Sequence, residues 1–96
     1  MNDLSYDAIL LYNKLKSGKV IKRTMLCKTI GTTDRHMREV LAELKRHYPI
    51  CNTENGSGYF IATTMDEARR QLKKENKRAR EIIFNTMGLK KFLKLR

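Results

Sequence analysis

The strongest apolar repeat in the chain lies in residues 34–44. Its apolar positions follow the spacing i, i+3, i+4 and i+7 and form one stripe that can face a core: Met37, Val40, Leu41 and Leu44. The opposite side of the same predicted helix is mainly charged and consists of Arg35, Arg38, Glu39, Ala42 and Arg46. Because a helix fits the width of a DNA major groove, this outer face is a candidate for reading base edges.

A shorter helix is predicted over 24–30, with Leu26 and Ile30 facing the core. Gly31 suits the left-handed position that ends a helix, and a hydroxyl of the following Thr-Thr pair can cap the helix that begins at Asp34. Two helices joined by so tight a turn form a helix-turn-helix.

An N-terminal helix is predicted from apolar residues at helical spacing: Leu4, Ala8, Leu11, Tyr12 and Leu15. Asp3 or Ser5 can cap its start, and Gly18 is expected to stop it. Residues 20–21 are β-prone and long enough for one short edge strand.

Pro49 is expected to end the second helix of the helix-turn-helix, after which the pattern becomes that of a β-hairpin. Residues 50–54 and 59–62 are β-prone, and the Asn55-Gly56 pair between them is a hairpin turn signal. We therefore expect an α+β fold, mostly α. Its order of elements is that of a winged helix-turn-helix, with three helices and a small β-hairpin wing.

A long C-terminal helix is predicted to begin after Thr64 and to run to about Met87, with Gly88 as its stop. Thr64 and Glu67 have the spacing of a capping box. At ~1.5 Å per residue the helix would be roughly 35 Å long, more than a domain this small can cover. Its a/d-like stripe is apolar at both ends and interrupted by Glu75. The candidate dimer contacts on or beside this stripe are Leu72, Ala79, Ile82 and Ile83.

Three arrangements of this helix fit the pattern. It can pair with a second copy, fold back on its own domain, or stand as a solvated basic rod. We expect the first, a homodimer formed through the C-terminal helix. The 96 residues allow only one core, so we divide the chain into a DNA-binding domain at 1–63 and a basic helix and tail at 64–96.

The charge of the chain is strongly basic and uneven. It has 21 Lys and Arg against 10 Asp and Glu, a net charge of +11, which favours a polyanionic partner. Residues 1–68 carry ten basic and eight acidic groups, net +2, whereas residues 69–96 carry eleven and two, net +9. Seven of these cations are expected to lie all around the long helix: Arg69, Arg70, Lys73, Lys74, Lys77, Arg78 and Arg80.

Other classes of protein find little support in the sequence. The N-terminus lacks a signal-peptide pattern and no apolar run could span a bilayer, so we expect a cytoplasmic protein without a membrane partner. Cys27 and Cys51 are expected to be free thiols in the core, and with His36 and His47 they lack the close pair spacing of zinc ligands. Without a phosphate-binding glycine loop, a nucleophile elbow or paired catalytic carboxylates, we expect no cofactor and no enzymatic activity.

The expected partner is double-stranded DNA. Arginine suits guanine edges, and Glu39 can accept a hydrogen bond from cytosine. Contacts that position the phosphate backbone are expected from residues that flank the outer face: Lys22, Lys28, Thr32, Thr33, His36, Lys45, Asn55 and Ser57. The wing at 52–58 has no Lys or Arg and one acid, Glu54, so it is poorly equipped to neutralise phosphates.

From Leu11 to Ile61, roughly half of its length, the chain resembles the winged-helix domain of the biotin repressor and its relatives. The residues that carry this resemblance are Leu26, Ile30, Gly31, Thr33, Met37, Leu41, Leu44 and the wing pattern Gly56-x-Gly58-Tyr59-x-Ile61. The resemblance implies DNA binding and gives no support for ligase chemistry.

The chain also resembles small phage-encoded proteins in which such a domain is followed by an acidic helix start and a long charged helix. This likeness is carried by Gly58-Tyr59-Phe60-Ile61-Ala62 and by Thr64-Met65-Asp66-Glu67. It implies a phage or prophage origin. The function we expect is therefore that of a small, homodimeric, phage-type transcriptional regulator that binds DNA sequence-specifically.

Two other functions fit the same residues. Winged helices also serve as protein-binding modules, and a partner protein would then meet the apolar residues Leu10, Phe60, Phe92 and Leu93. Alternatively, residues 69–96 alone bind nucleic acid without sequence preference, as in a replication or packaging accessory protein, with a steep dependence on salt.

Overall fold

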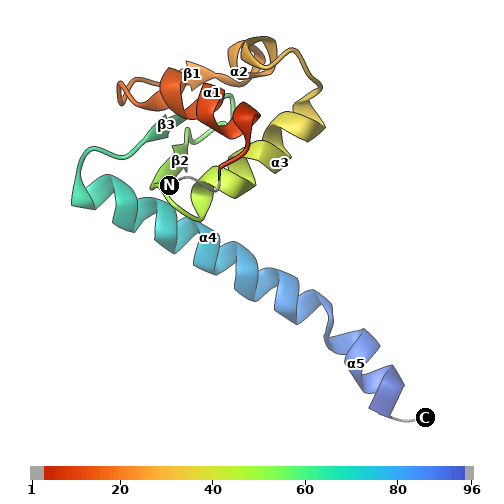
Figure 1. Cartoon of the computed structure of the whole chain (residues 1–96). Helices are drawn as coiled ribbons and strands as arrows, with labels where there is room; N and C mark the ends of the chain where they lie inside the picture. The colour runs from red at the N-terminus through yellow and green to blue at the C-terminus, as the bar shows by residue number, and fades with distance from the viewer. Residues whose placement is uncertain (1–3, 95–96) are drawn as a thin grey trace.

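The computed structural model describes residues 4–94 and is an α+β fold, mostly helical, which confirms the predicted class (Figure 1). In chain order its elements are α1 (Tyr6–Leu15), β1 (Ile21–Lys22), α2 (Arg23–Thr29), α3 (Asp34–Lys45), β2 (Ile50–Asn52), β3 (Gly58–Ile61), α4 (Met65–Asn85) and α5 (Met87–Lys94). Elements α1 to β3 form a small globular domain, and α4 passes beneath the sheet and leaves it as a rod.

The first helix, α1, begins at the predicted serine cap. The Ser5 hydroxyl accepts a hydrogen bond from the Ala8 backbone N–H at 3.2 Å, which satisfies one of the free donors at the start of the helix. The alternative cap, Asp3, lies outside the described residues. The apolar side of α1 packs on α3 and α2, with Leu11 and Leu15 fully buried.

The turn between α2 and α3 is as tight as the sequence predicts. Gly31 has φ +59°, a left-handed conformation that costs a residue with a side chain more than glycine. The Thr33 hydroxyl then accepts from the His36 backbone N–H at 3.2 Å and caps α3. The prediction that Pro49 ends this helix is wrong: α3 ends at Lys45, because the His47 N–H turns back to the Leu44 carbonyl at 2.9 Å.

The sheet is antiparallel and its strand order is β1-β3-β2. The edge strand expected at residues 20–21 forms at Ile21–Lys22, where Ile21 lies opposite Tyr59. The hairpin β2–β3 pairs Cys51 with Phe60, and Gly56 in its turn has φ +71°. The predicted hairpin and its Asn-Gly turn are therefore confirmed.

The core of the domain combines the apolar stripes of α1, α2 and α3 with residues of the sheet. Its buried members are Ala8, Leu11, Leu15, Leu26, Met37, Val40, Leu41, Leu44, Ile50 and Tyr59. At about 1.5–3 kcal/mol for each large side chain removed from water, this one cluster accounts for most of the apolar burial of the domain. Beside it, the rings of Tyr12 and Tyr48 stack with centroids 4.5 Å apart.

The long helix α4 begins where the capping box predicts. The Thr64 hydroxyl accepts from the Glu67 backbone N–H at 3.2 Å, and the Glu67 carboxylate accepts from the Thr63 N–H at 2.9 Å. The prediction that Gly88 stops the helix is wrong. The chain breaks at Thr86, whose hydroxyl donates to the Ile83 carbonyl at 2.7 Å, and Gly88 lies inside the next helix, α5.

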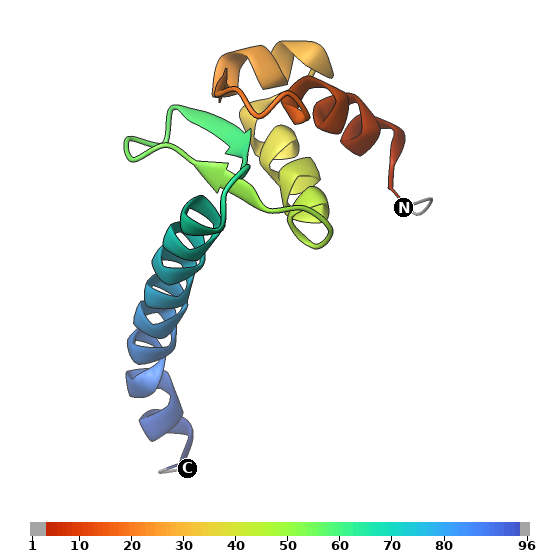
Figure 2. The same cartoon turned by 90° about the vertical axis from the view of Figure 1, so that its left-hand side faces the viewer.

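The rod makes the molecule elongated. The extents are 51 × 30 × 28 Å, and the radius of gyration is 16.2 Å, against roughly 12.5 Å for a compact chain of this length. Figure 2 shows α4 and α5 extending well away from the domain. The first half of α4 contacts β2, and no described residue of α4 is fully buried.

Candidate nucleic-acid interface

The outer side of α3 is fully accessible. All five residues predicted to read bases are exposed there: Arg35, Arg38, Glu39, Ala42 and Arg46. Their stripe lies opposite the buried one, because α3 docks on the core through Met37, Val40, Leu41 and Leu44. Among the described residues, Arg35 and Arg46 have no ion-pair partner, so both side chains can meet a ligand without breaking an existing contact.

Asp34, at the first turn of α3, holds two arginines from different elements. Its carboxylate oxygens lie 2.9 Å from the Arg38 Nε and 3.3 Å from the Arg23 Nε, at the start of α2. About half of each arginine side chain is exposed, and such surface ion pairs contribute little to stability. Asp34 therefore orients the two guanidinium groups toward one side of α3, and a stronger anion can still recruit them.

The side of α3 nearest α1 is occupied by internal contacts. His36, predicted to contact phosphate, lies between two carboxylates: its Nε2 is 3.3 Å from Asp7 and its Nδ1 is 3.4 Å from Glu39. One turn later, Glu43 accepts hydrogen bonds from Ser5, and these bonds hold the pKa of the Glu43 carboxyl below its usual 4.5. This side of α3 is therefore bonded to α1 and the residue before it, whereas the other side of α3 is accessible to a ligand.

On that open side, a hollow of about 280 Å³ lies between α3, the turn of the β2–β3 hairpin and α4. Four of the residues that line it are cations from three separate helices: Arg23, Arg38, Lys45 and Arg78. Asn52, Gly56 and Tyr59 of the hairpin complete its rim, and we call it the basic hollow. It lies between the outer face of α3 and α4, and it brings Arg38 and Arg78 to one place on the surface.

Polar contacts fasten α4 beside this hollow. The Lys74 ammonium donates to the Asn52 side-chain oxygen at 3.0 Å and to its carbonyl at 3.3 Å, and the Asn52 N–H donates to Gln71 at 3.2 Å. Lys45 of α3 lies 3.9 Å from Glu75. Because Gln71, Lys74 and Arg78 follow one another at i, i+3 and i+7, the docking that seats Gln71 on β2 also brings Arg78 to the hollow.

The turn of the β2–β3 hairpin contributes shape and no positive charge. The Asn55 side-chain oxygen accepts from the Thr53 hydroxyl, the Ser57 hydroxyl and the Ser57 N–H, at 2.9, 2.8 and 3.1 Å. Both predicted phosphate contacts of the wing, Asn55 and Ser57, are thus engaged in holding the turn. The Ser57 carbonyl also accepts from the Arg23 N–H at 2.9 Å, which joins the turn to the start of α2.

The remaining predicted backbone contacts are scattered. Lys22 on β1 and Lys28 in the last turn of α2 are exposed, but neither lines the basic hollow. Thr33 uses its hydroxyl to cap α3, and Thr32 is half-buried in the turn. Only Lys45 of this group lies in the hollow.

Sequence reasoning missed three contributors to the hollow: Arg23, Asn52 and Arg78 as a neighbour of Arg38. The cations of α4 lie all around the helix, as expected, and they divide into sets on different sides of it. Lys74 and Arg78 face the domain, while Arg69, Lys73 and Arg80 line a shallow hollow elsewhere on the helix surface. The angular position of each cation around the helix, measured from Gln71, separates these sets, because Gln71 is the residue that contacts β2.

Over residues 4–94, the structure brings together no group of three His, Cys, Asp or Glu side chains suited to a metal ion. Neither α4 nor any other described helix is both long enough and apolar enough to cross a bilayer. Comparison of the chain with protein-family models, with curated proteins and with solved structures found no match.

Proposed function

We propose that this protein is a winged helix-turn-helix that binds double-stranded DNA sequence-specifically, as a small phage-type transcriptional regulator. The observation that carries the proposal is the basic hollow, which joins the exposed face of α3 to the turn of the wing and to Arg78. In this arrangement α3 enters the major groove, and the hollow lies over one strand of the backbone.

Recognition of bases falls to the exposed face of α3. Arg35 and Arg46 are unpaired with any described acid, and Arg38 can exchange the Asp34 carboxylate for a guanine edge. Ala42 offers a small apolar surface to a thymine methyl group.

Contact with the phosphates falls to the hollow and to α4. The turn of the wing lacks a cation, and Arg78 supplies positive charge next to Gly56, where a basic wing would otherwise supply it. Arg23 and Lys45 lie in the same hollow, so three cations beside Arg38 can neutralise one stretch of backbone. The residues proposed to specify the DNA sequence are thus separate from those proposed to position the protein on the DNA backbone.

The test is selection of bound duplexes from a random pool by the full-length chain, repeated with Arg38→Ala. A preferred sequence in the wild type that changes at one position in the variant is the expected result. Arg80→Ala is the matched control, because Arg80 lies outside the hollow and should leave the preferred sequence intact. Binding without any preferred sequence would assign the chain to nonspecific nucleic-acid binding, and no binding to DNA would reject the proposal.

A further inference from the structure

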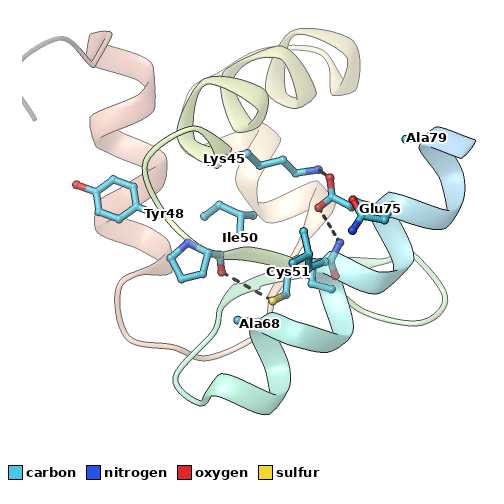
Figure 3. A pocket seen from close by; sticks show the side chains of 11 residues that line it. Lys45, Tyr48, Ile50, Cys51, Ala68, Glu75 and Ala79 are labelled. Atoms are coloured by element: carbon cyan, nitrogen blue, oxygen red, sulfur yellow. Dashed lines mark hydrogen bonds and ion pairs between the residues drawn. The ribbon is translucent and has the colours of Figure 1, made fainter.

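A second groove, of about 470 Å³, opens between the end of α3, β2 and the first half of α4 (Figure 3). The residues that give it an apolar character come from both walls: Tyr48, Pro49 and Ile50 on the domain, and Ala68, Leu72 and Ala79 on α4. We call it the apolar groove. It is distinct from the basic hollow, with which it shares only Lys45 among its lining residues.

The charged residues at its rim are already paired within the chain. Glu75 accepts a hydrogen bond from the Gln71 amide at 3.1 Å and lies 3.9 Å from the Lys45 ammonium, as Figure 3 shows. The carboxylate that interrupts the apolar stripe in the sequence is therefore drawn toward its own domain. Asn76 and part of Glu75 remain exposed at this rim, beside the exposed side chains of Leu72 and Ala79. Because the Glu75 carboxylate is paired within the chain, the groove suits a mainly apolar occupant better than a phosphate.

The far half of the rod offers a matching surface. Ile82 and Ile83 are 56% and 58% exposed, and Leu89 is 69% exposed. Ile82 lines a hollow together with Lys45 and Asn52 of the domain, whereas Ile83 and Leu89 lie further along the rod. A continuous run of large exposed apolar side chains marks a site of protein association. In the near half of α4 the apolar side is concave, between the helix and the domain, whereas in the far half it is convex.

We propose that the apolar groove receives the far end of α4 from a second copy of this chain, packed antiparallel and crossing at Ala79. In a parallel pair, the apolar groove of one copy would face the apolar groove of the other. The convex far halves of the two rods would then meet each other, and neither groove would be filled. An antiparallel pair inserts each convex half into the groove of the other copy. The small side chain of Ala79 at the crossing allows the two helices to approach closely.

Charge favours the same direction. The described part of α5 carries Lys90, Lys91 and Lys94 without an acidic residue, so a parallel pair would place two such clusters side by side. The antiparallel pair separates these clusters and brings each one to the start of the partner's α4. That start carries the two acids Asp66 and Glu67, followed by Arg69 and Arg70, and Asp66 lies 3.5 Å from Arg69. The charge argument for the antiparallel direction is therefore the separation of the two lysine clusters.

This inference goes beyond the proposed function, because the association needs no DNA. Its test is therefore sedimentation equilibrium of the full-length protein at tens of micromolar in the absence of DNA. We expect a dimer for the wild type, a monomer for Ile83→Glu and a dimer for Phe84→Glu. Ile83 and Phe84 are similarly exposed neighbours, but Phe84 lies about 100° further round the helix, away from the apolar stripe.

Neither substitution touches the buried core, so circular dichroism should show both variants folded. A monomeric wild type would overturn the proposal, as would equal behaviour of the two variants.

Cross-linking tests the direction. Residues 72 and 86 lie equally far from Ala79 on its two sides, so the antiparallel pair brings Leu72 of one copy opposite Thr86 of the other. In a Cys27→Ser, Cys51→Ala background that sediments as the wild type does, a mixture of Leu72→Cys and Thr86→Cys proteins should form the mixed disulfide. Disulfides that join only identical variants would show a parallel pair and overturn the antiparallel arrangement.

Discussion

The Glu43 carboxylate on α3 accepts two hydrogen bonds from Ser5, one from its backbone N–H at 2.7 Å and one from its hydroxyl at 2.8 Å. Ser5 is also the cap of α1. A single acidic side chain thus fastens the start of α1 to the helix that presents Arg38 and Arg46 on other sides. Ser5 and Glu43 are 38 residues apart in the sequence, and their contact anchors one side of the candidate recognition helix.

This contact predicts a dependence of stability on acid. Hydrogen bonds from Ser5 lower the pKa of Glu43, and the backbone N–H of Thr63 lowers the pKa of Glu67 in the same way. A carboxyl whose pKa is lowered by folding stabilises the fold above its ordinary value of 4.5 and loses that contribution as the pH falls through its lowered pKa. We expect the urea midpoint to fall as the pH drops below 4.5.

Replacement of Glu43 by Gln should remove part of this dependence. The variant is expected to be less stable than the wild type at neutral pH, and the difference should shrink in acid, where the wild-type carboxyl is protonated. Urea titrations of both proteins over a pH series measure this. A constant difference at all pH values would mean that the ionised form of Glu43 contributes nothing.

The outer face of α3 predicts which substitutions alter sequence preference. Arg38→Ala should weaken binding to a selected site by ~1–3 kcal/mol and relax the preference at one base pair. Fluorescence anisotropy with the selected duplex and with single-base variants of it measures both effects. If the loss is equal on every sequence, Arg38 contacts phosphate and the base-reading role passes to Arg35 or Arg46.

The position of Arg78 predicts how salt dependence divides along α4. Changing Lys45 and Arg78, two cations of the basic hollow, to glutamine should lower affinity similarly for specific and random duplexes. The slope of log K against log salt should flatten by up to ~0.9 for each phosphate contact removed. The matched control changes Lys73 and Arg80, which lie on another side of α4 and should leave the slope unaltered. Equal effects of the two pairs would contradict the basic hollow as the backbone contact.

Two glycines should respond oppositely to alanine. A Cβ at Gly58 would lie 2.8 Å from a Val20 methyl carbon and 3.2 Å from the Ile21 carbonyl, so Gly58→Ala should destabilise the domain by about 1–3 kcal/mol. A Cβ at Gly88 meets nothing within 4 Å, and inside a helix alanine is favoured by ~1 kcal/mol. Thermal unfolding should report the first change, and helix content by circular dichroism the second.

The two thiols should differ in reactivity. Cys51 is buried beneath α4, and desolvation raises its pKa above 9.0, which lowers the thiolate fraction that reacts. Cys27 is only half-buried. With iodoacetamide at mild alkaline pH we expect one fast alkylation in the native protein and two in urea. Cys27→Ser should abolish the fast one, and rapid modification of that variant would show that the contact between α4 and β2 opens readily.

Local spacing was enough to predict most of the elements of this fold. The stripe from Met37 to Leu44, the caps at Ser5 and Thr33 and the left-handed Gly31 all depend on residues within one or two turns of each other. Such signals reside in short stretches of sequence, because helix periodicity and capping are local. Where local signals competed, as at Gly88 and Pro49, the predicted helix ends were wrong.

The candidate interface required the tertiary structure. Arg38 and Arg78 meet because Asn52 bonds to Gln71 and Lys74, which sets the rotation of α4 on β2. The same rotation draws Glu75 toward Lys45, and Ile83 stays exposed on the rod beyond the apolar groove. Amphipathic periodicity predicts that a helix has an apolar and a polar face. Which face meets the domain depends on side chains of distant elements, and these pair only once the sheet has formed.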